Sequence, residues 1–310
     1  MICRLSQSLP SVTGEGRREM IDALTIMMAM ASAANAPAAA TEDPLTRPIA
    51  VERAAEWLEP EPPQQVYGNT YLVGFSGLSV ALVDTGAGLV LIDGALPQAA
   101  PMILANVRAL GFDPKDIRFI LSTEPHWDHA GGLAALARDT GATVVASAHA
   151  AESLRMGRMT TDDPQYAYGG EFPSVTNLRI VKDGEVLQLG KTRITAHATA
   201  GHTLGSMSWS WQACDGKKGC KAIIFASSLN PVTADGYRYT SKSGAPFLSA
   251  FQKSYRIMNT LPCNILISAH PDNAGSGRYN AKPGACRAYA DRSRGLLAKR
   301  LKGERDGTIE

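Results

Sequence analysis

Short apolar runs alternate with longer segments of helical periodicity along most of the chain. In the first half, β-branched runs predict strands, and apolar residues at helical spacing predict helices. The strands are expected at 78–86, 88–94, 117–123 and 142–147, and the helices at 97–111 and 131–141. Gly86-Ala87-Gly88 separates the first two strands and predicts a hairpin that ends in Asp93-Gly94.

The second half repeats this alternation. Strands are expected at 178–184, 185–190, 192–199, 206–211, 221–227 and 264–269, and helices at 246–261 and from about Pro283 to Lys302. Strand-rich blocks with helices in both halves predict an α/β (α+β) fold, an αββα sandwich of two facing mixed sheets with outer helices. Residues 57–74 read as an irregular arm leading into a strand, and residues 156–174, which lack periodicity, as a loop bordering a site.

The first forty residues differ from the rest. Arg17 and Arg18 precede an apolar run from Met20 to Ala40, and the run ends in small residues that fit a signal-peptidase site. The run is alanine-rich and short for a membrane span, which needs about 20 strongly apolar residues. We therefore expect a leader at 1–40, with a buried amphipathic helix as the alternative and Met20 as a possible start of translation.

The remaining chain is expected to form one domain at residues 41–303 with two similar halves, followed by a polar tail at 304–310. Hydrophobic residues at 45% and charged residues at 19% describe an ordinary globular protein. The formal charge is +2, and no Lys/Arg stripe is present. We therefore expect no nucleic-acid partner.

The five cysteines point to an oxidising compartment. Cys214 and Cys220 bracket a turn between two expected strands, so a hairpin could bring their sulfurs within bonding reach. Cys263 and Cys286 flank a strand–loop–helix corner where a second bridge is feasible, and Cys3 would leave with the leader. Two disulfides imply a compartment such as the periplasm, whereas free buried thiols are the alternative.

The stretch STEPHWDHAGG, residues 122–132, carries the clearest chemistry. Glu124, His126, Asp128 and His129 lie within six residues at the end of an expected strand, where alternate side chains face the same way. His202 and His270 also follow expected strands. Because zinc accepts imidazole nitrogen and carboxylate oxygen, these six groups predict two metals with three ligands each at one rim of the sandwich.

Two other histidines have weaker contexts. His149 is interpreted as a surface residue. His197 precedes His202 by five positions on an expected strand, and it is either a packed structural residue or a group that supports the ligands.

The order and spacing of these motifs resemble the metallo-β-lactamase superfamily. The Asp93-Gly94 turn, the cluster at 124–129, AGHTLGS and AHP carry the resemblance, which is specific to subclass B3 from about Trp57 to Lys302. In IIFASSLNPV, Ser228 stands where many relatives place aspartate and other lactamase subclasses place cysteine, and serine is typical of B3. Glyoxalase-like thioesterases of the superfamily are mostly cytosolic, whereas this chain is expected to be exported and disulfide-bonded. Nothing matches the SxxK motif of serine β-lactamases.

The resemblance implies hydrolysis of the β-lactam ring by a metal-bound hydroxide at a dinuclear zinc site. The implied ligands are Glu124, His126 and His202 for the first zinc, and Asp128, His129 and His270 for the second. Asp128 would also orient the hydroxide. The substrate-binding residues would be Ser228, as a hydrogen-bonding group behind the metals, and Asn230, which either receives the drug's carboxylate or only forms a turn before Pro231. The resemblance also implies a Cys263–Cys286 disulfide.

Glu124 stands where the family places histidine. A carboxylate adds negative charge, which should make the first zinc a weaker Lewis acid and favour harder ions. Its longer side chain must also find a geometry that the rigid ring of histidine supplies, so we expect the first zinc to bind more weakly than the second. Alternative functions are hydrolysis of a lactone, thioester or ester, and non-catalytic zinc binding. We further expect a periplasmic or secreted monomer acting on a small-molecule substrate without a membrane partner.

Overall fold

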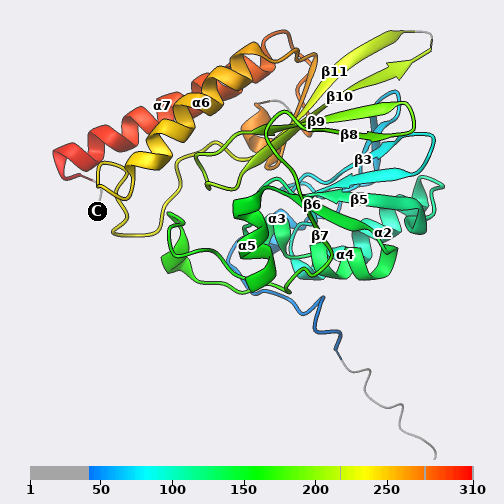
Figure 1. The fold of residues 1–310 in the computed structure, drawn as a ribbon, viewed down its shortest axis with the longest axis horizontal. Helices are drawn as coiled ribbons and strands as arrows, with labels where there is room; N and C mark the ends of the chain where they lie inside the picture. Colours follow the sequence, from blue (N-terminus) through cyan, green and yellow to red (C-terminus); the bar gives the residue numbers. More distant parts are fainter. Residues whose placement is uncertain (1–41, 217, 276, 309–310) are drawn as a thin grey trace, which may run out of the picture. The chain divides into compact units, whose positions relative to one another are not determined.

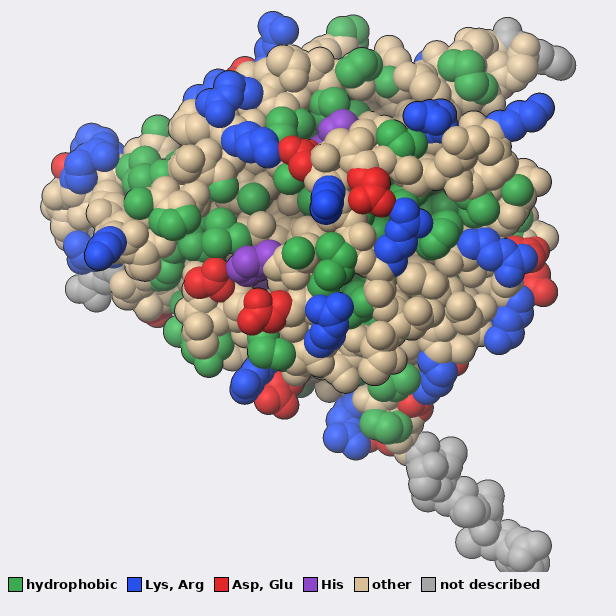
Figure 2. Space-filling model, in the orientation of Figure 1, with side chains coloured by type: hydrophobic (Ala, Val, Ile, Leu, Met, Phe, Trp, Pro, Cys, Tyr) green, Lys and Arg blue, Asp and Glu red, His purple; other side chains and the backbone are tan. Residues whose placement is uncertain are grey.

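The computed structural model describes residues 42–216, 218–275 and 277–308 (Figure 1). The predicted leader at 1–40 and Cys3 lie outside the described residues. No helix in this part of the chain is long and apolar enough to cross a membrane. On the face drawn in Figure 2, Lys and Arg side chains are scattered among acidic and hydrophobic ones and do not form a stripe.

The first half of the chain forms a seven-stranded sheet whose spatial order follows the sequence. Its first four strands are antiparallel, and the last four are parallel to one another. Gly86 and Gly88 have positive φ and close the predicted hairpin between β3 and β4. The strands are β1 Gln64–Tyr67, β2 Thr70–Leu72, β3 Ala81–Asp84, β4 Leu89–Ile92, β5 Ile117–Leu121, β6 Thr143–Ala146 and β7 Leu178–Ile180.

The second half forms a five-stranded sheet in the order β12-β11-β10-β9-β8. Strands β8 to β11 are antiparallel, and β12 lies parallel to β11. These strands are β8 Val186–Leu189, β9 Thr192–Ala198, β10 Met207–Asp215, β11 Gly219–Ala226 and β12 Ile265–Ser268. Cys214 and Cys220 pair across the β10–β11 hairpin as a disulfide, and a second disulfide joins Cys263, before β12, to Cys286 in α7.

Helices cover the outer faces of both sheets, and the αββα sandwich is confirmed (Figure 1). Helices α2 and α4 pack on the first sheet, whereas α6 and α7 lie together on the second. Between the sheets, the buried indoles of Trp209 and Trp211 pack with aliphatic side chains of both halves. The α-helices are α1 Ala54–Trp57, α2 Ala100–Ala109, α3 Trp127–Ala130, α4 Leu133–Thr140, α5 Ala148–Met156, α6 Ala245–Thr260 and α7 Ala285–Asp306. Short 3-10 turns occur at Pro97–Ala99, Pro114–Asp116, Tyr166–Tyr168 and Pro271–Ala274.

Three helices and one boundary differ from the sequence prediction. Helices α1 and α3 have four residues each, too few to show a helical period. Helix α5 was missed although Ser147 caps it by accepting a hydrogen bond from the Ala150 N–H. Helix α7 extends to Asp306, because the buried Glu304 carboxylate is held by the Tyr239 and Thr240 N–H groups. The interpretation of residues 304–306 as part of a polar tail is therefore corrected.

Candidate metal centre

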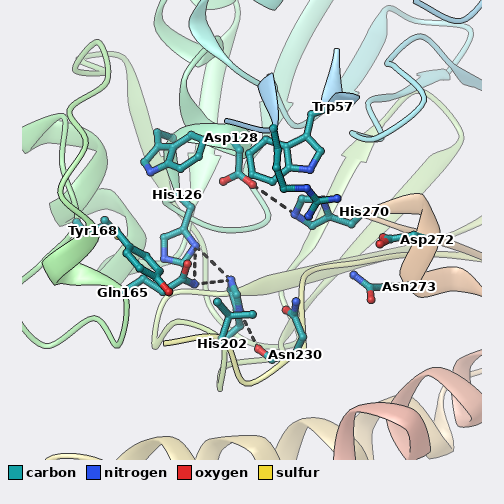
Figure 3. Close-up of a pocket in the computed structure, with 14 residues that line it drawn as sticks. Trp57, His126, Asp128, Gln165, Tyr168, His202, Asn230, His270, Asp272 and Asn273 are labelled. Carbon is teal, nitrogen blue, oxygen red and sulfur yellow. Dashed lines mark hydrogen bonds and ion pairs between the residues drawn. The ribbon is translucent and has the colours of Figure 1, made fainter. Parts of the chain in front are cut away.

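The six predicted metal ligands gather at one rim, where strands of both sheets end. The chain leaves β5 at Leu121 and runs through buried residues into α3, which brings Glu124, His126, Asp128 and His129 to the rim. His202 comes from the connection between β9 and β10, and His270 follows β12. Figure 3 shows the side chains of His126, Asp128, His202 and His270 meeting in one pocket.

The three residues predicted for the second metal form the tighter group. Asp128 Oδ2 lies 3.4 Å from His129 Nε2 and 3.3 Å from His270 Nε2, and the two imidazole nitrogens are 3.1 Å apart. One ligand atom from each of the three residues lies within 4.8 Å of the other two. This spacing suits a single metal ion.

The three residues predicted for the first metal are brought together less evenly. His126 Nδ1 and His202 Nε2 face each other at 3.2 Å. Glu124 Oε1 instead lies 3.0 Å from His129 Nε2, on the side of the other group. Ser228 holds this carboxylate, since its hydroxyl donates to Oε1 at 2.6 Å and its N–H donates to Oε2 at 3.2 Å.

Each of the four imidazoles has one ring nitrogen that points away from the centre of the cluster, and this outer nitrogen lies beside a protein acceptor. An imidazole that donates N–H outward keeps its other nitrogen as a lone-pair acceptor, the form that metals bind. The inner nitrogens are therefore available toward the centre of the cluster. The outer contacts are His126 Nε2 to Asp163 Oδ2 at 3.0 Å, His129 Nδ1 to Asp93 Oδ2 at 3.5 Å, His202 Nδ1 to the Asn230 carbonyl at 2.8 Å and His270 Nδ1 to the Gly77 carbonyl at 3.3 Å.

Asp93 organises the cluster from behind, at the end of the predicted hairpin. Its carboxylate accepts hydrogen bonds from the Thr123 N–H at 2.8 Å and the Thr123 hydroxyl at 2.6 Å, in addition to its contact with His129. The residue has a φ of 67°, a region that Asp tolerates better than most residues. Burial raises the pKa of Asp93 despite these hydrogen bonds. The two hydrogen bonds from Thr123 thus fix the carboxylate beneath the ligands.

The two carboxylates of the cluster are held in their ionised form despite their burial. Burial by itself would raise the pKa of Glu124, but the charges of His129 and His202 outweigh it and hold that pKa below its usual range. Burial likewise opposes ionisation of Asp128, and His129 and His270 again hold its pKa well below normal. Four imidazole nitrogens and two buried carboxylates are a donor set that suits zinc, so the residues present fit the metal that the sequence predicts.

A cavity of about 290 Å³ opens over the cluster. Its walls come partly from the loop at 156–174, which was expected to border a site, and partly from the N-terminal arm, which was not. They include Arg53 and Trp57 of the N-terminal arm, Gln165 and Tyr168 of the loop after α5, and Trp127. The Trp57 ring lies 5.6 Å from both the His270 and the Trp127 rings. The amide nitrogen of Gln165 lies 3.1 Å from His202 Nε2. No local pattern marks these residues, because loops bring them to the site.

Of the two residues predicted to bind substrate, Asn230 lines the cavity and Ser228 does not (Figure 3). The Asn230 side-chain oxygen is buried and has no hydrogen-bond partner among the described residues. Ser228 is 1% exposed and lies behind Glu124. It therefore positions Glu124 from outside the cavity.

The remaining histidines lie outside the cluster. His197 Nε2 is 2.7 Å from the Ser210 hydroxyl on the neighbouring strand β10, which supports the reading of a packed structural residue. His149 is half-buried and not fully on the surface, because its Nε2 pairs with Asp162 at 3.0 Å.

Residues 64–215 match the family described as the metallo-beta-lactamase superfamily. A solved structure described as the first B3 metallo-beta-lactamase with an active-site glutamic acid is 71% identical, with a TM-score of 0.84; the alignment covers 86% of this chain and 99% of that chain. The chain belongs to the metallo-beta-lactamase superfamily. Another member, the Rm3 metallo-beta-lactamase, is 41% identical, with a TM-score of 0.78, and the alignment covers 83% of this chain and all (100%) of that one.

The chain is also similar, at lower identity, to a protein named as a different hydrolase. The hydroxyacylglutathione hydrolase of Rhodobacter capsulatus is 28% identical over 223 residues, which cover 71% of this chain and 73% of that protein. The B3 metallo-beta-lactamases are thus considerably more similar to this chain than that hydrolase is.

Proposed function

We propose that the protein is a subclass B3 metallo-beta-lactamase that hydrolyses the amide of the β-lactam ring at a site for two zinc ions. The observation that carries this proposal is the set of four imidazoles whose inner nitrogens converge with two carboxylates below the cavity. The 71% identity to a B3 enzyme with an active-site glutamic acid supports the same assignment.

The contacts among the imidazoles support two ligand sets. His126 and His202 would hold the first zinc together with Glu124, and Asp128, His129 and His270 would hold the second. When bound, zinc supplies a Lewis acid that polarises a carbonyl and lowers the pKa of water toward neutrality. Ser228 donates hydrogen bonds to both oxygens of Glu124 and keeps this carboxylate next to His129. This arrangement supports weaker zinc binding at the first position.

The chain's own groups orient and enclose the substrate. Asp128, at the floor of the cavity, would accept a hydrogen bond from the attacking water and keep a lone pair directed at the amide carbon. The Asn230 side chain would donate its N–H₂ to the carboxylate of the drug. Trp57, Trp127 and Tyr168 wall the cavity with aromatic surface and exclude bulk water from the amide.

We also propose that the enzyme works outside the cytoplasm. The two disulfides of the described part support this, because such bonds persist in oxidising compartments such as the periplasm. A single processed chain acting on small molecules is the expected form.

The deciding experiment is hydrolysis of nitrocefin and imipenem by the purified protein across a zinc titration, with bound zinc counted in the same samples. We expect turnover to rise as the count passes from one zinc to two. Full turnover at one zinc would contradict a role for Glu124 as a working ligand. Absence of turnover at two zincs would overturn the lactamase assignment itself.

The same samples should be assayed with a thioester, a lactone and a simple ester. The similarity to hydroxyacylglutathione hydrolases makes the thioester the relevant alternative. We expect these substrates to turn over at least about a hundredfold more slowly than the β-lactams, a difference of about 2.7 kcal/mol in transition-state stabilisation.

A further inference from the structure

A buried carboxylate on the loop after α5 contacts the ligand cluster from outside. Asp163 lies between α5 and β7, in a segment expected only to shape the cavity, and its side chain is 3% exposed. Its Oδ2 atom is 3.0 Å from His126 Nε2, and its Oδ1 atom accepts a hydrogen bond from the Gln165 N–H at 2.8 Å. Burying an unpaired carboxylate costs free energy, so the Asp163 side chain is held against His126 and the Gln165 N–H.

The contact with Asp163 determines which ring nitrogen of His126 is available to a metal. When Nε2 carries the proton and donates to Asp163, Nδ1 keeps its lone pair, and that atom faces His202 Nε2 at 3.2 Å. The reverse tautomer would place two acceptors against each other at the Asp163 contact. A carboxylate behind a ligand imidazole also raises the basicity of the ring toward a metal.

The loop that carries Asp163 is bonded to the segment that orients His202. The Ala234 N–H donates to the Pro164 carbonyl at 2.9 Å, and the Tyr168 hydroxyl donates to the Thr233 carbonyl at 2.7 Å. The same segment supplies the Asn230 carbonyl that accepts from His202 Nδ1. Both imidazoles of the first group are thus oriented by two loops that are joined to each other.

We propose that Asp163 is a positioning residue for the first metal. Through this contact, the affinity for that metal depends on the loop between α5 and β7. The proposal rests on the metal site of the proposed function. Its importance follows from Glu124, whose oxygens are held by Ser228, so that His126 and His202 are the two imidazoles on which the first position depends.

The test is zinc and cobalt(II) binding by Asp163→Asn, with Asp162→Asn as the matched control. Asp162 is the adjacent carboxylate of the same loop but pairs with His149, which lies outside the cluster. We expect Asp163→Asn to weaken one of the two metals by about 10- to 100-fold and to leave the other within about twofold. The cobalt absorption bands of the weakened position should change, whereas Asp162→Asn should match the wild type.

Unchanged binding of both metals in a folded Asp163→Asn protein would overturn the proposal, as would equal weakening of both. Nitrogen-15 imidazole spectra of the wild-type zinc protein test it without a substitution: His126 should carry its proton on Nε2, and a proton on Nδ1 would contradict it. Neither readout requires β-lactam turnover. A protein that binds two metals in this manner yet hydrolyses no β-lactam would refute the proposed function and leave this inference standing.

Discussion

At the scale of single residues, Glu124 distinguishes this chain from the family pattern, which has histidine at this position. We expect Glu124→His to strengthen zinc binding at the first position by about tenfold or more, because a neutral imidazole replaces a carboxylate that Ser228 holds toward His129. The zinc concentration for half-maximal nitrocefin turnover should fall accordingly. Identical zinc dependence in variant and wild type would show that Glu124 does not limit the first site.

His197 offers a test of pH dependence away from the ligands. Burial lowers its pKa, although Asp183 partly opposes the shift. The folded protein thus prefers the neutral ring of His197. The stability that this preference contributes is fully present above the unfolded pKa of about 6.5 and is lost as the pH falls toward the lower folded pKa.

We therefore expect His197→Gln, which can still bond Ser210, to lose less stability than the wild type between pH 7.5 and pH 5.5. Urea unfolding at the two pH values measures this difference. Parallel losses in both proteins would show that His197 does not contribute to the pH dependence.

The sequence was most informative about residues whose chemistry and spacing recur. Glu124, His126, Asp128 and His129 could be predicted because a strand end places close neighbours on one rim. Asp163 and Trp57 could not, because a carboxylate or an indole in an aperiodic segment has no local signature. Their roles arise only when loops fold back onto the cluster. Ser228 was expected to act as a hydrogen-bonding group, but its partner, Glu124, could not be deduced from the sequence.

At the scale of elements, the C-terminal helix α7 is anchored at its last turn. Glu304 accepts hydrogen bonds from the Tyr239 and Thr240 N–H groups and from Arg300. We expect Glu304→Ala to lower the free energy of unfolding by about 1–3 kcal/mol, because backbone donors lose their partner. Urea denaturation should show the loss. Asp306→Ala on the same helix is the control and should change stability by no more than about 0.5 kcal/mol.

The two disulfides close loops of different size. Cys263 and Cys286 are separated by 23 positions, whereas Cys214 and Cys220 are separated by 6. Because a longer closed loop removes more entropy from the unfolded chain, the Cys263→Ser/Cys286→Ser variant should lose about 1 kcal/mol more than the Cys214→Ser/Cys220→Ser variant. Denaturant unfolding of both double variants measures the difference. Equal losses would mean that strain or residual structure dominates over loop length.

Strands and long helices were predictable from periodicity, and their order determined the sandwich. Helices α1 and α3 were not, since four residues complete barely one turn and are held by tertiary packing. The end of α7 was missed for a related reason. Its last turn is polar in sequence, and only the contact with residues 239–240 makes it part of the fold.

At the scale of the whole molecule, the metal ligands join the two halves. Glu124, His126, Asp128 and His129 follow β5 of the first sheet, whereas His202 and His270 come from the second. Removing metal should therefore destabilise the entire domain. Zinc at 100 times its dissociation constant stabilises by about 2.7 kcal/mol per site.

We expect a chelator to lower the midpoint of thermal unfolding by about 5–10 °C per site, as measured by calorimetry. His149→Ala should show the same shift, because that residue pairs with Asp162 away from the cluster. Equal midpoints with zinc and with chelator would contradict a metal that spans the two halves.

The position of Arg53 and Trp57 limits where the chain could be cleaved without changing the cavity. These residues belong to the first described segment, yet they form a wall of the cavity beside His270. An exported chain has its N-terminus made by a protease, so the cleavage point decides whether this wall exists. A cut after Trp57 would leave the sandwich whole and open the cavity to solvent on one side, and a bulky fusion partner just before Arg53 would crowd its mouth. If the leader expected at 1–40 is removed, the place of cleavage would therefore affect the shape of the cavity.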